Sequence, residues 1–201
     1  PTLISVGTNH YFGHKKEGNF EFLQAFCSDN NIELHSPLMR EHMGSTISSS
    51  LIRSLILDGN SSRVYDYLGR YYGFNATVVS GSNRGKTMNY PTANFIPIFE
   101  NQLLPSTGVY LTRVFLDGEC YFGMMNAGVR PTFNEKKFVM EVHILSDKFG
   151  HLYDKNFYIE FLDKIRDEKK FDSKELLIKQ IEKDKEVCIE LIDTFKEKYE
   201  I

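Results

Sequence analysis

Hydrophobic and polar positions follow two different patterns along the chain. Up to about residue 72, strand-like and helix-like segments alternate: TLISVG (2–7), FEFLQAFCSD (20–29), IELHSP (32–37), SSSLIRSLILDG (48–59) and SSRVYDYLG (61–69). A strand, a helix and a second strand in this order predict an α/β unit with parallel strands. The last two segments begin with serines and end at Gly59 and Gly69, which predicts two helices with serine N-caps and glycine stops.

Beyond residue 72 the segments become short and rich in β-branched and aromatic residues. They are FNATVVS (74–80), GVYLTRVFL (108–116), CYFGMMNAG (120–128), FVMEVHIL (138–145) and NFYIEFL (156–162). Turn signals such as DGE at 117–119 separate them, which predicts an antiparallel barrel or sandwich. We therefore expect two domains, residues 1–72 and residues 73–201.

A helical pattern closes the chain at residues 172–199. Asp172 followed by Glu175 predicts a capping box at its start. The apolar positions fall on one stripe, formed by Leu177, Ile181, Cys188, Leu191 and Phe195. We expect this stripe to pack on the β domain.

Composition restricts the partners and the compartment. The net charge of -3, from 24 basic and 27 acidic residues, provides no strong field for nucleic acid or a membrane surface, so we expect small-molecule partners. Three scattered cysteines predict neither a disulfide framework nor a zinc site, and no apolar run reaches the length of a membrane span. We expect a cytoplasmic protein. Because the chain begins at Pro1 with a core-like strand, we also expect an N-terminal part to be missing.

The stretch GSNRGKTMNYPTANF (81–95) concentrates candidate chemistry. Gly81 and Gly85 would let backbone amides approach a phosphate, and Arg84 or Lys86 would supply positive charge. The alternative is a surface hairpin loop followed by an edge strand, since glycines alone are a weak signal.

Two oxygen-bearing side chains follow Pro91 in this stretch. Alternation along a strand would direct Thr92 and Asn94 to one face and Ala93 to the other. A hydroxyl and an amide oxygen are hard ligands that suit Mg²⁺ in contact with phosphates.

A second candidate lies in FVMEVHIL, where alternation puts Glu141 and His143 on one strand face and Val142 on the other. If Glu141 lies beside Thr92 and Asn94, it can act as a general base toward a substrate hydroxyl. The alternative is a carboxylate on a solvated strand face.

Four segments, taken in their order along the chain, resemble riboflavin kinase: RGKTMNYPTANF, NAGVRPTF, MEVHIL and IRDEKKFDSKELLIKQIEKD. More specifically, the chain from about Gly73 to its end resembles the C-terminal half of the prokaryotic bifunctional riboflavin kinase/FMN adenylyltransferases. The resemblance implies a six-stranded antiparallel Greek-key barrel with a C-terminal helix. It also implies an enzyme that uses ATP and Mg²⁺ to phosphorylate riboflavin to FMN.

The resemblance implies roles for matched positions. In the ATP site the phosphates would be bound by Gly81, Gly85, Lys86, Thr92, Asn94 and Arg166, with Thr92 and Asn94 also holding Mg²⁺. Glu141 would be the base, and Ile144, Ser146 and Tyr153 would line the flavin side. One departure is that Met88, Asn89 and Tyr90 replace the usual L-G-F before P-T-A-N.

The first domain resembles part of the family's Rossmann-like FMN adenylyltransferase domain. ISSSLIR (47–53) matches a signature whose serines and arginine bind ATP phosphates, which implies such a site at Ser48, Ser49, Ser50 and Arg53. Simple N-capping by the serines is the alternative. Asn9 and His10 replace the usual Asp and Phe, and no histidine pair forms the family's H-x-G-H motif, so we expect poor FAD synthesis.

Two other functions remain open at this point. A degenerate barrel could hold flavin or nucleotide without turnover, which the altered Met88–Tyr90 stretch would favour. A barrel that binds single-stranded nucleic acid would need interleaved basic and aromatic residues, and YLTRVFLDGECYFG (110–123) offers only Arg113 as a cation.

Overall fold

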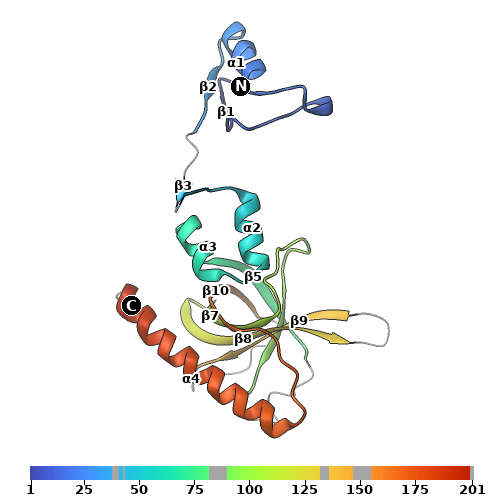
Figure 1. The fold of residues 1–201 in the computed structure, drawn as a ribbon, viewed down its shortest axis with the longest axis vertical. Helices are drawn as coiled ribbons and strands as arrows, with labels where there is room; N and C mark the ends of the chain where they lie inside the picture. Colours follow the sequence, from blue (N-terminus) through green and yellow to red (C-terminus); the bar gives the residue numbers. More distant parts are fainter. Residues whose placement is uncertain (38–40, 43, 82–89, 132–135, 147–154, 200–201) are drawn as a thin grey trace. The chain divides into compact units, whose positions relative to one another are not determined.

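The computed structural model describes residues 1–37, 41–42, 44–81, 90–131, 136–146 and 155–199. The chain forms two compact units, Pro1–Ser48 and Ser49–Ile201, which we describe one at a time (Figure 1). The helices α2 (Ser49–Leu57) and α3 (Ser61–Leu68) are therefore in one unit with the β-rich part. The assignment of residues 1–72 and 73–201 to two enzymatic domains stays a prediction.

The first unit is a small α/β arrangement. Its elements are β1 (Leu3–Ser5), η1 (His14–Lys16), α1 (Phe20–Asp29), β2 (Glu33–His35), β3 (Glu41–His42) and β4 (Ser45–Thr46). Strands β1 and β2 pair in parallel on either side of α1 in the sequence, as the pattern predicted. The side chain of Asn19 caps α1 by accepting a hydrogen bond from the Phe22 amide at 2.9 Å.

The second unit is built on a closed antiparallel barrel (Figure 1). Its strands are β5 (Tyr72–Val79), β6 (Ala93–Pro97), β7 (Gly108–Leu116), β8 (Glu119–Pro131), β9 (Lys136–Ile144) and β10 (Asn156–Arg166). The order around the barrel is β10-β5-β6-β9-β8-β7. Strands β7, β8 and β9 form consecutive hairpins and β10 returns beside β7, which is a Greek-key arrangement. The predicted six-stranded barrel is confirmed.

Period-two alternation fills the barrel interior. Phe74, Ala76 and Val78 of β5 are buried, and they share one continuous core with Phe95 of β6 and Met140 of β9. Strand β6 pairs with β5 on one side and with β9 on the other. It is thus a wall strand of the barrel, and the alternative of an edge strand after the glycine-rich stretch is wrong.

Helices α2 and α3 start and stop largely where the sequence predicted. Helix α3 ends at Gly69, whose left-handed backbone (φ 68°) forms the predicted glycine stop. Its N-cap, however, is Asn60, which makes no side-chain capping hydrogen bond, so the serine cap predicted for this helix is wrong. Ser61 instead occupies the first helical position and is buried.

Helix α4 (Lys174–Tyr199) runs along the outside of the barrel (Figure 1). Ser173 accepts a hydrogen bond from the Leu176 amide at 3.3 Å, so the cap lies one residue after the predicted Asp172. The apolar stripe is confirmed over most of its length, since Cys188 is buried against β7, β8 and β10 and Ile181, Leu191 and Phe195 pack on the same cluster. Among the helices of the described residues, none combines the length and apolar character that a bilayer crossing requires.

Candidate functional site

The candidate site lies on the outer face of the barrel wall, where β6, β9 and β8 run side by side. Asn94 pairs with Glu141, and Glu141 pairs with Asn126 on its other side. Directly paired residues of neighbouring strands point to the same face. Because Met140 and Val142 are buried in the core, Glu141 and the two asparagine side chains flanking it face outward.

Thr92 is linked directly to the carboxylate of this row. Its hydroxyl donates a hydrogen bond to Glu141 Oε2 at 3.1 Å. Thr92 lies just before β6, so it reaches Glu141 from the strand's beginning while Asn94 lies opposite Glu141 within the ladder. The structure therefore brings together the three residues that were predicted to share a site.

Arg130 completes the environment of this carboxylate. Its Nη2 lies 2.9 Å from Glu141 Oε1, and the two side chains are 33% and 18% exposed. Both carboxylate oxygens thus accept a hydrogen bond from protein donors, one from an arginine and one from a threonine. Our sequence analysis missed Arg130. Alternation along NAGVRPTF shows that Asn126, Gly128 and Arg130 share one strand face, but only the pairing of Asn126 with Glu141 shows that this face carries the carboxylate.

Gly81 gives the Asn94 side chain its space. A Cβ atom at position 81 would lie 2.0 Å from Asn94 Nδ2 and 2.5 Å from its Cγ. Gly81 was predicted to let the backbone approach a phosphate. The structure gives a second reason for a glycine here, which is the close approach of the Asn94 side chain. Gly85 and Lys86, the other predicted cradle residues, lie outside the described residues.

His143 lies two residues beyond Glu141 on the same face of β9. Its Nδ1 is 2.8 Å from the carbonyl oxygen of Pro91, and the ring of Tyr90 meets its ring edge to face at 5.4 Å. Burial lowers the pKa of His143; the Pro91 carbonyl opposes this shift, and the charge of Lys185 adds to it. Burial also raises the pKa of Tyr90, as do Glu182 and Glu186 of α4.

Arg166, predicted to contact the nucleotide, is bound to helix α4. Its Nε and Nη2 donate to the carboxylate of Asp184 at 2.8 to 3.0 Å, and Gln180 also donates to that carboxylate at 2.8 Å. Asp184 is buried (3% exposed side chain) and Arg166 is nearly so (14%). This pair connects β10 to α4, so the guanidinium has a structural partner that the sequence analysis did not identify.

The residues predicted on the flavin side are dispersed. Ile144 is 7% exposed and belongs to the barrel core, where it pairs with Gly123. Ser146 is half-buried just after β9. Tyr153 lies outside the described residues, as do Met88 and Asn89 of the altered stretch.

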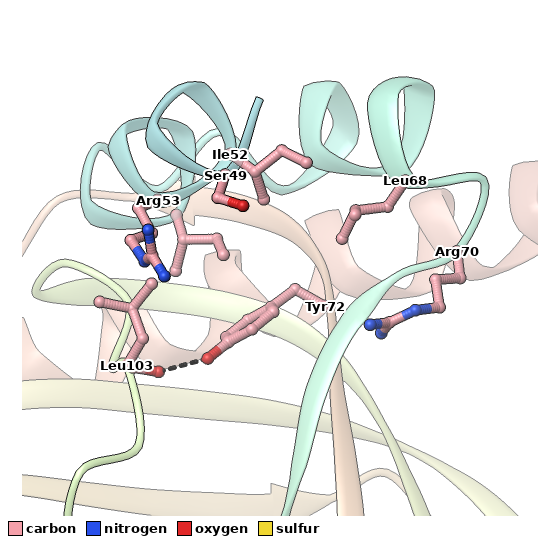
Figure 2. A pocket seen from close by; sticks show the side chains of 8 residues that line it. Ser49, Ile52, Arg53, Leu68, Arg70, Tyr72 and Leu103 are labelled. Carbon is pink, nitrogen blue, oxygen red and sulfur yellow. Dashed lines mark hydrogen bonds between the residues drawn. The ribbon is translucent and has the colours of Figure 1, made fainter. Parts of the chain in front are cut away.

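The predicted adenylyltransferase phosphate site borders a separate pocket. Ser49 and Arg53 of α2 line a cavity of about 300 Å³ together with Arg70 and Tyr72, over apolar side chains (Figure 2). The Tyr72 hydroxyl donates to the Leu103 carbonyl at 2.6 Å and accepts from Gln102 at 2.7 Å. Ser48 directly precedes this helix and Ser50 is an exposed residue of its first turn.

The donor set around Glu141 has the chemistry of a site for a hard cation. It offers a hydroxyl oxygen from Thr92, an amide oxygen from Asn94 and a nearby carboxylate, which are ligands of the kind that Mg²⁺ prefers. The space beside Gly81 that a Cβ would fill is occupied by the amide of Asn94 itself. Within the described residues, no three His, Cys, Asp or Glu side chains cluster as a metal site.

Comparison with protein families matches residues 68–192 to the flavokinase model, described as riboflavin kinase. A bifunctional riboflavin kinase/FMN adenylyltransferase of Haemophilus influenzae is 35% identical over 193 residues, which cover 92% of this chain and 60% of that protein. The protein of the same name in Bacillus subtilis is 37% identical over 146 residues, covering 71% of this chain and 46% of that protein. The chain thus spans about 60% of the length of the Haemophilus relative.

Among solved structures, one titled as a macrolide-efflux protein from Streptococcus pneumoniae superposes with a TM-score of 0.82 at 33% identity. It is matched over 93% of this chain and 60% of that chain. The family model covers the whole barrel and most of α4, including Thr92, Asn94 and Glu141. The chain belongs to the riboflavin kinase family.

Proposed function

We propose that this chain transfers the γ-phosphoryl group of ATP to riboflavin and so produces FMN and ADP. One observation carries the proposal: the Glu141 carboxylate lies on the same outer face as Asn94 and accepts a hydrogen bond from Thr92 at 3.1 Å. A base beside two oxygen ligands for a cation suits an alcohol phosphotransferase.

Glu141 has the role of base in this reaction. The terminal hydroxyl oxygen of the ribityl chain forms a bond to the γ-phosphorus, and the bond from that phosphorus to the β,γ-bridging oxygen breaks. The hydroxyl proton passes to Glu141, and the bridging oxygen leaves with ADP. Each carboxylate oxygen has more than one acceptor position, so Glu141 can accept this proton while Arg130 and Thr92 keep it oriented.

Thr92 and Asn94 would hold Mg²⁺. When bound, the cation neutralises charge on the phosphates and aligns them for in-line transfer. Thr92 uses its only hydrogen for Glu141, so its oxygen lone pairs remain to face a cation. Glu141 therefore orients the Thr92 hydroxyl in the sense that metal binding requires.

The phosphate and flavin contacts complete the proposal. By resemblance, Gly81, Gly85 and Lys86 would approach the ATP phosphates, and Ser146 and Tyr153 would line the flavin. The burial of Ile144 leaves it almost no surface to offer a flavin in this conformation. The Arg166 guanidinium binds Asp184. We therefore place the nucleotide contact of this region in the segment that follows Arg166.

The experiment incubates the purified chain with riboflavin, ATP and Mg²⁺ and separates the products by chromatography. We expect FMN and ADP in equal amounts, and no FMN when EDTA removes the cation. A chain that binds riboflavin without forming FMN would contradict the proposal and support a flavin-binding barrel. The adenylyltransferase activity named in the relatives is not part of this proposal.

A further inference from the structure

Two side chains on one face of β9 contact the two consecutive residues that directly precede β6. Glu141 accepts a hydrogen bond from the Thr92 hydroxyl, and His143 contacts the carbonyl oxygen of Pro91. Val142 between them is 2% exposed and points into the barrel, so the two polar side chains emerge on the same side. The Pro91–Thr92 segment is thus held at its backbone and at its side chain from one strand.

Pro91 lies where its contact with His143 can orient Thr92. The ladder between β6 and β9 begins with the pair Ala93–Val142, so Pro91 lies just before the regular strand. Proline has no amide hydrogen and contributes only its carbonyl to hydrogen bonding. The His143 contact at 2.8 Å therefore fixes the peptide that joins Pro91 to Thr92, immediately before the proposed metal ligand.

The surroundings of His143 indicate that its Nδ1 carries the hydrogen in this contact. A carbonyl oxygen only accepts, so Nδ1 must carry the hydrogen and donate it to Pro91. The Tyr90 ring meets the imidazole edge to face, and Lys185 of α4 lies within electrostatic range. Burial lowers the pKa of His143 and Lys185 adds to this, while the Pro91 carbonyl opposes it; the net lowering matches a neutral imidazole with its hydrogen on Nδ1.

We infer that His143 is a positioning residue for the proposed reaction: by binding the Pro91 carbonyl it sets the orientation in which Thr92 reaches both Glu141 and the cation. This inference rests on the proposed kinase function. It predicts that turnover depends on the Nδ1 donor, and depends less on the size and ring of the side chain. A histidine that only fills space would show the opposite dependence.

Three substitutions separate these dependences. His143→Asn keeps an N–H at the position of Nδ1, because both atoms are bonded to Cγ. His143→Gln moves its amide nitrogen one bond further, to the position of Nε2. His143→Leu removes the donor and keeps an apolar side chain. If the Leu variant fails to fold, the comparison of Asn with Gln still decides, since both are neutral amides.

Two measurements are made on the full chain. In steady-state kinetics, His143→Gln and His143→Leu should lower kcat by roughly ten- to a hundredfold, with little change in the KM for riboflavin. The reason is that these variants misalign Thr92 and leave the riboflavin contacts in place. His143→Asn should stay within about threefold of the unsubstituted chain. In calorimetric titrations with ADP, Mg²⁺ should strengthen binding in the unsubstituted and Asn chains, and clearly less in the Gln and Leu chains.

The outcomes separate the two proposals. If the unsubstituted chain forms no FMN, the proposed function fails. If it forms FMN and the Gln and Leu variants match it in kcat and in the Mg²⁺ effect on ADP binding, the positioning role fails alone. An Asn variant as impaired as the Leu variant also overturns this role, because the retained donor would then have no effect.

Discussion

At the scale of single residues, Glu141 has an environment that fits a base held in one orientation. Arg130 contacts one oxygen and the Thr92 hydroxyl contacts the other, so the carboxylate cannot rotate without breaking a hydrogen bond. Side chains held this way lose less freedom when a reaction begins. The same contacts explain how a threonine hydroxyl and a carboxylate from different strands stay aligned.

Arg130 should therefore affect turnover through Glu141. We expect Arg130→Met to lower kcat by about tenfold or more, since a freed carboxylate samples unproductive orientations, and Arg130→Lys to recover part of the loss. Steady-state kinetics of FMN formation measures both. In a Glu141→Gln background, Arg130→Met should have almost no further effect. A full additional loss in that background would show that Arg130 acts elsewhere.

Gly81 should control the position of Asn94. The added Cβ of Gly81→Ala would lie 2.0 Å from Asn94 Nδ2, so the amide must move. We expect kcat to fall by roughly ten- to a hundredfold, with a higher Mg²⁺ concentration needed for half-maximal rate. The neighbouring exposed Ser80, changed to Ala, is the matched control and should leave both values nearly unchanged. Normal kinetics in Gly81→Ala would remove Asn94 from the site.

Much of this residue-level arrangement could be predicted from the sequence. Alternation put Thr92 and Asn94 on one face, and Glu141 and His143 on one face of another strand, and it left open whether these faces would meet. The structure brings the side chains of Thr92, Asn94 and Glu141 together. Arg130 was missed because its contact spans several residues along a paired strand, and pairing register is not visible in one sequence. The same reason hid the contact of His143 with Pro91.

At the scale of elements, helix α4 is attached to the barrel by more than its apolar stripe. Asp184 lies on that stripe between Ile181 and Cys188, is 3% exposed, and binds Arg166 at the end of β10. A charged residue between apolar positions of a helical stripe is a signal of a buried partner. Our sequence analysis identified the apolar stripe but not Asp184 as a buried partner within it.

Removing the charge of Asp184 should destabilise the barrel unit. Asp184→Asn leaves the Arg166 guanidinium buried beside a neutral amide, which we expect to cost about 3–5 kcal/mol in the free energy of unfolding. Chemical denaturation followed by circular dichroism measures the change. The control is Asp117→Asn, which removes an exposed ion pair with Lys155 and should cost less than about 1 kcal/mol. Equal losses in the two variants would contradict a buried anchor.

The boundaries of strands and helices were predicted better than the pairing of distant strands into a closed barrel. The strand at 108–116 and the helix at 20–29 were predicted to the residue, because alternation and helical periodicity are local signals. The local pattern left a barrel and a sandwich open, and only the resemblance implied a six-stranded barrel, since the pairing of β6 with β9 joins segments about fifty residues apart. The cap of α4 moved from Asp172 to Ser173, a shift that local composition does not decide.

At the scale of the whole molecule, the chain combines a complete barrel with a small α/β unit, Pro1–Ser48. The family match covers the barrel and most of α4, and the proposed reaction depends on residues of the barrel unit. The relatives extend over a greater length than this chain, which spans 60% of the Haemophilus protein. The kinase proposal therefore depends on one wall of the barrel, where β6, β9 and β8 meet.

The most direct test of this account is the rate of FMN formation in a single turnover by Glu141→Gln. Glutamine keeps the size of the side chain and cannot accept the substrate proton, so the rate should fall at least about a hundredfold. Glu160→Gln is the matched control, because Glu160 also pairs with an arginine on the barrel wall, Arg113 at 2.6 Å, and should stay within about threefold. An undiminished rate in Glu141→Gln would contradict the assignment of Glu141 as the base.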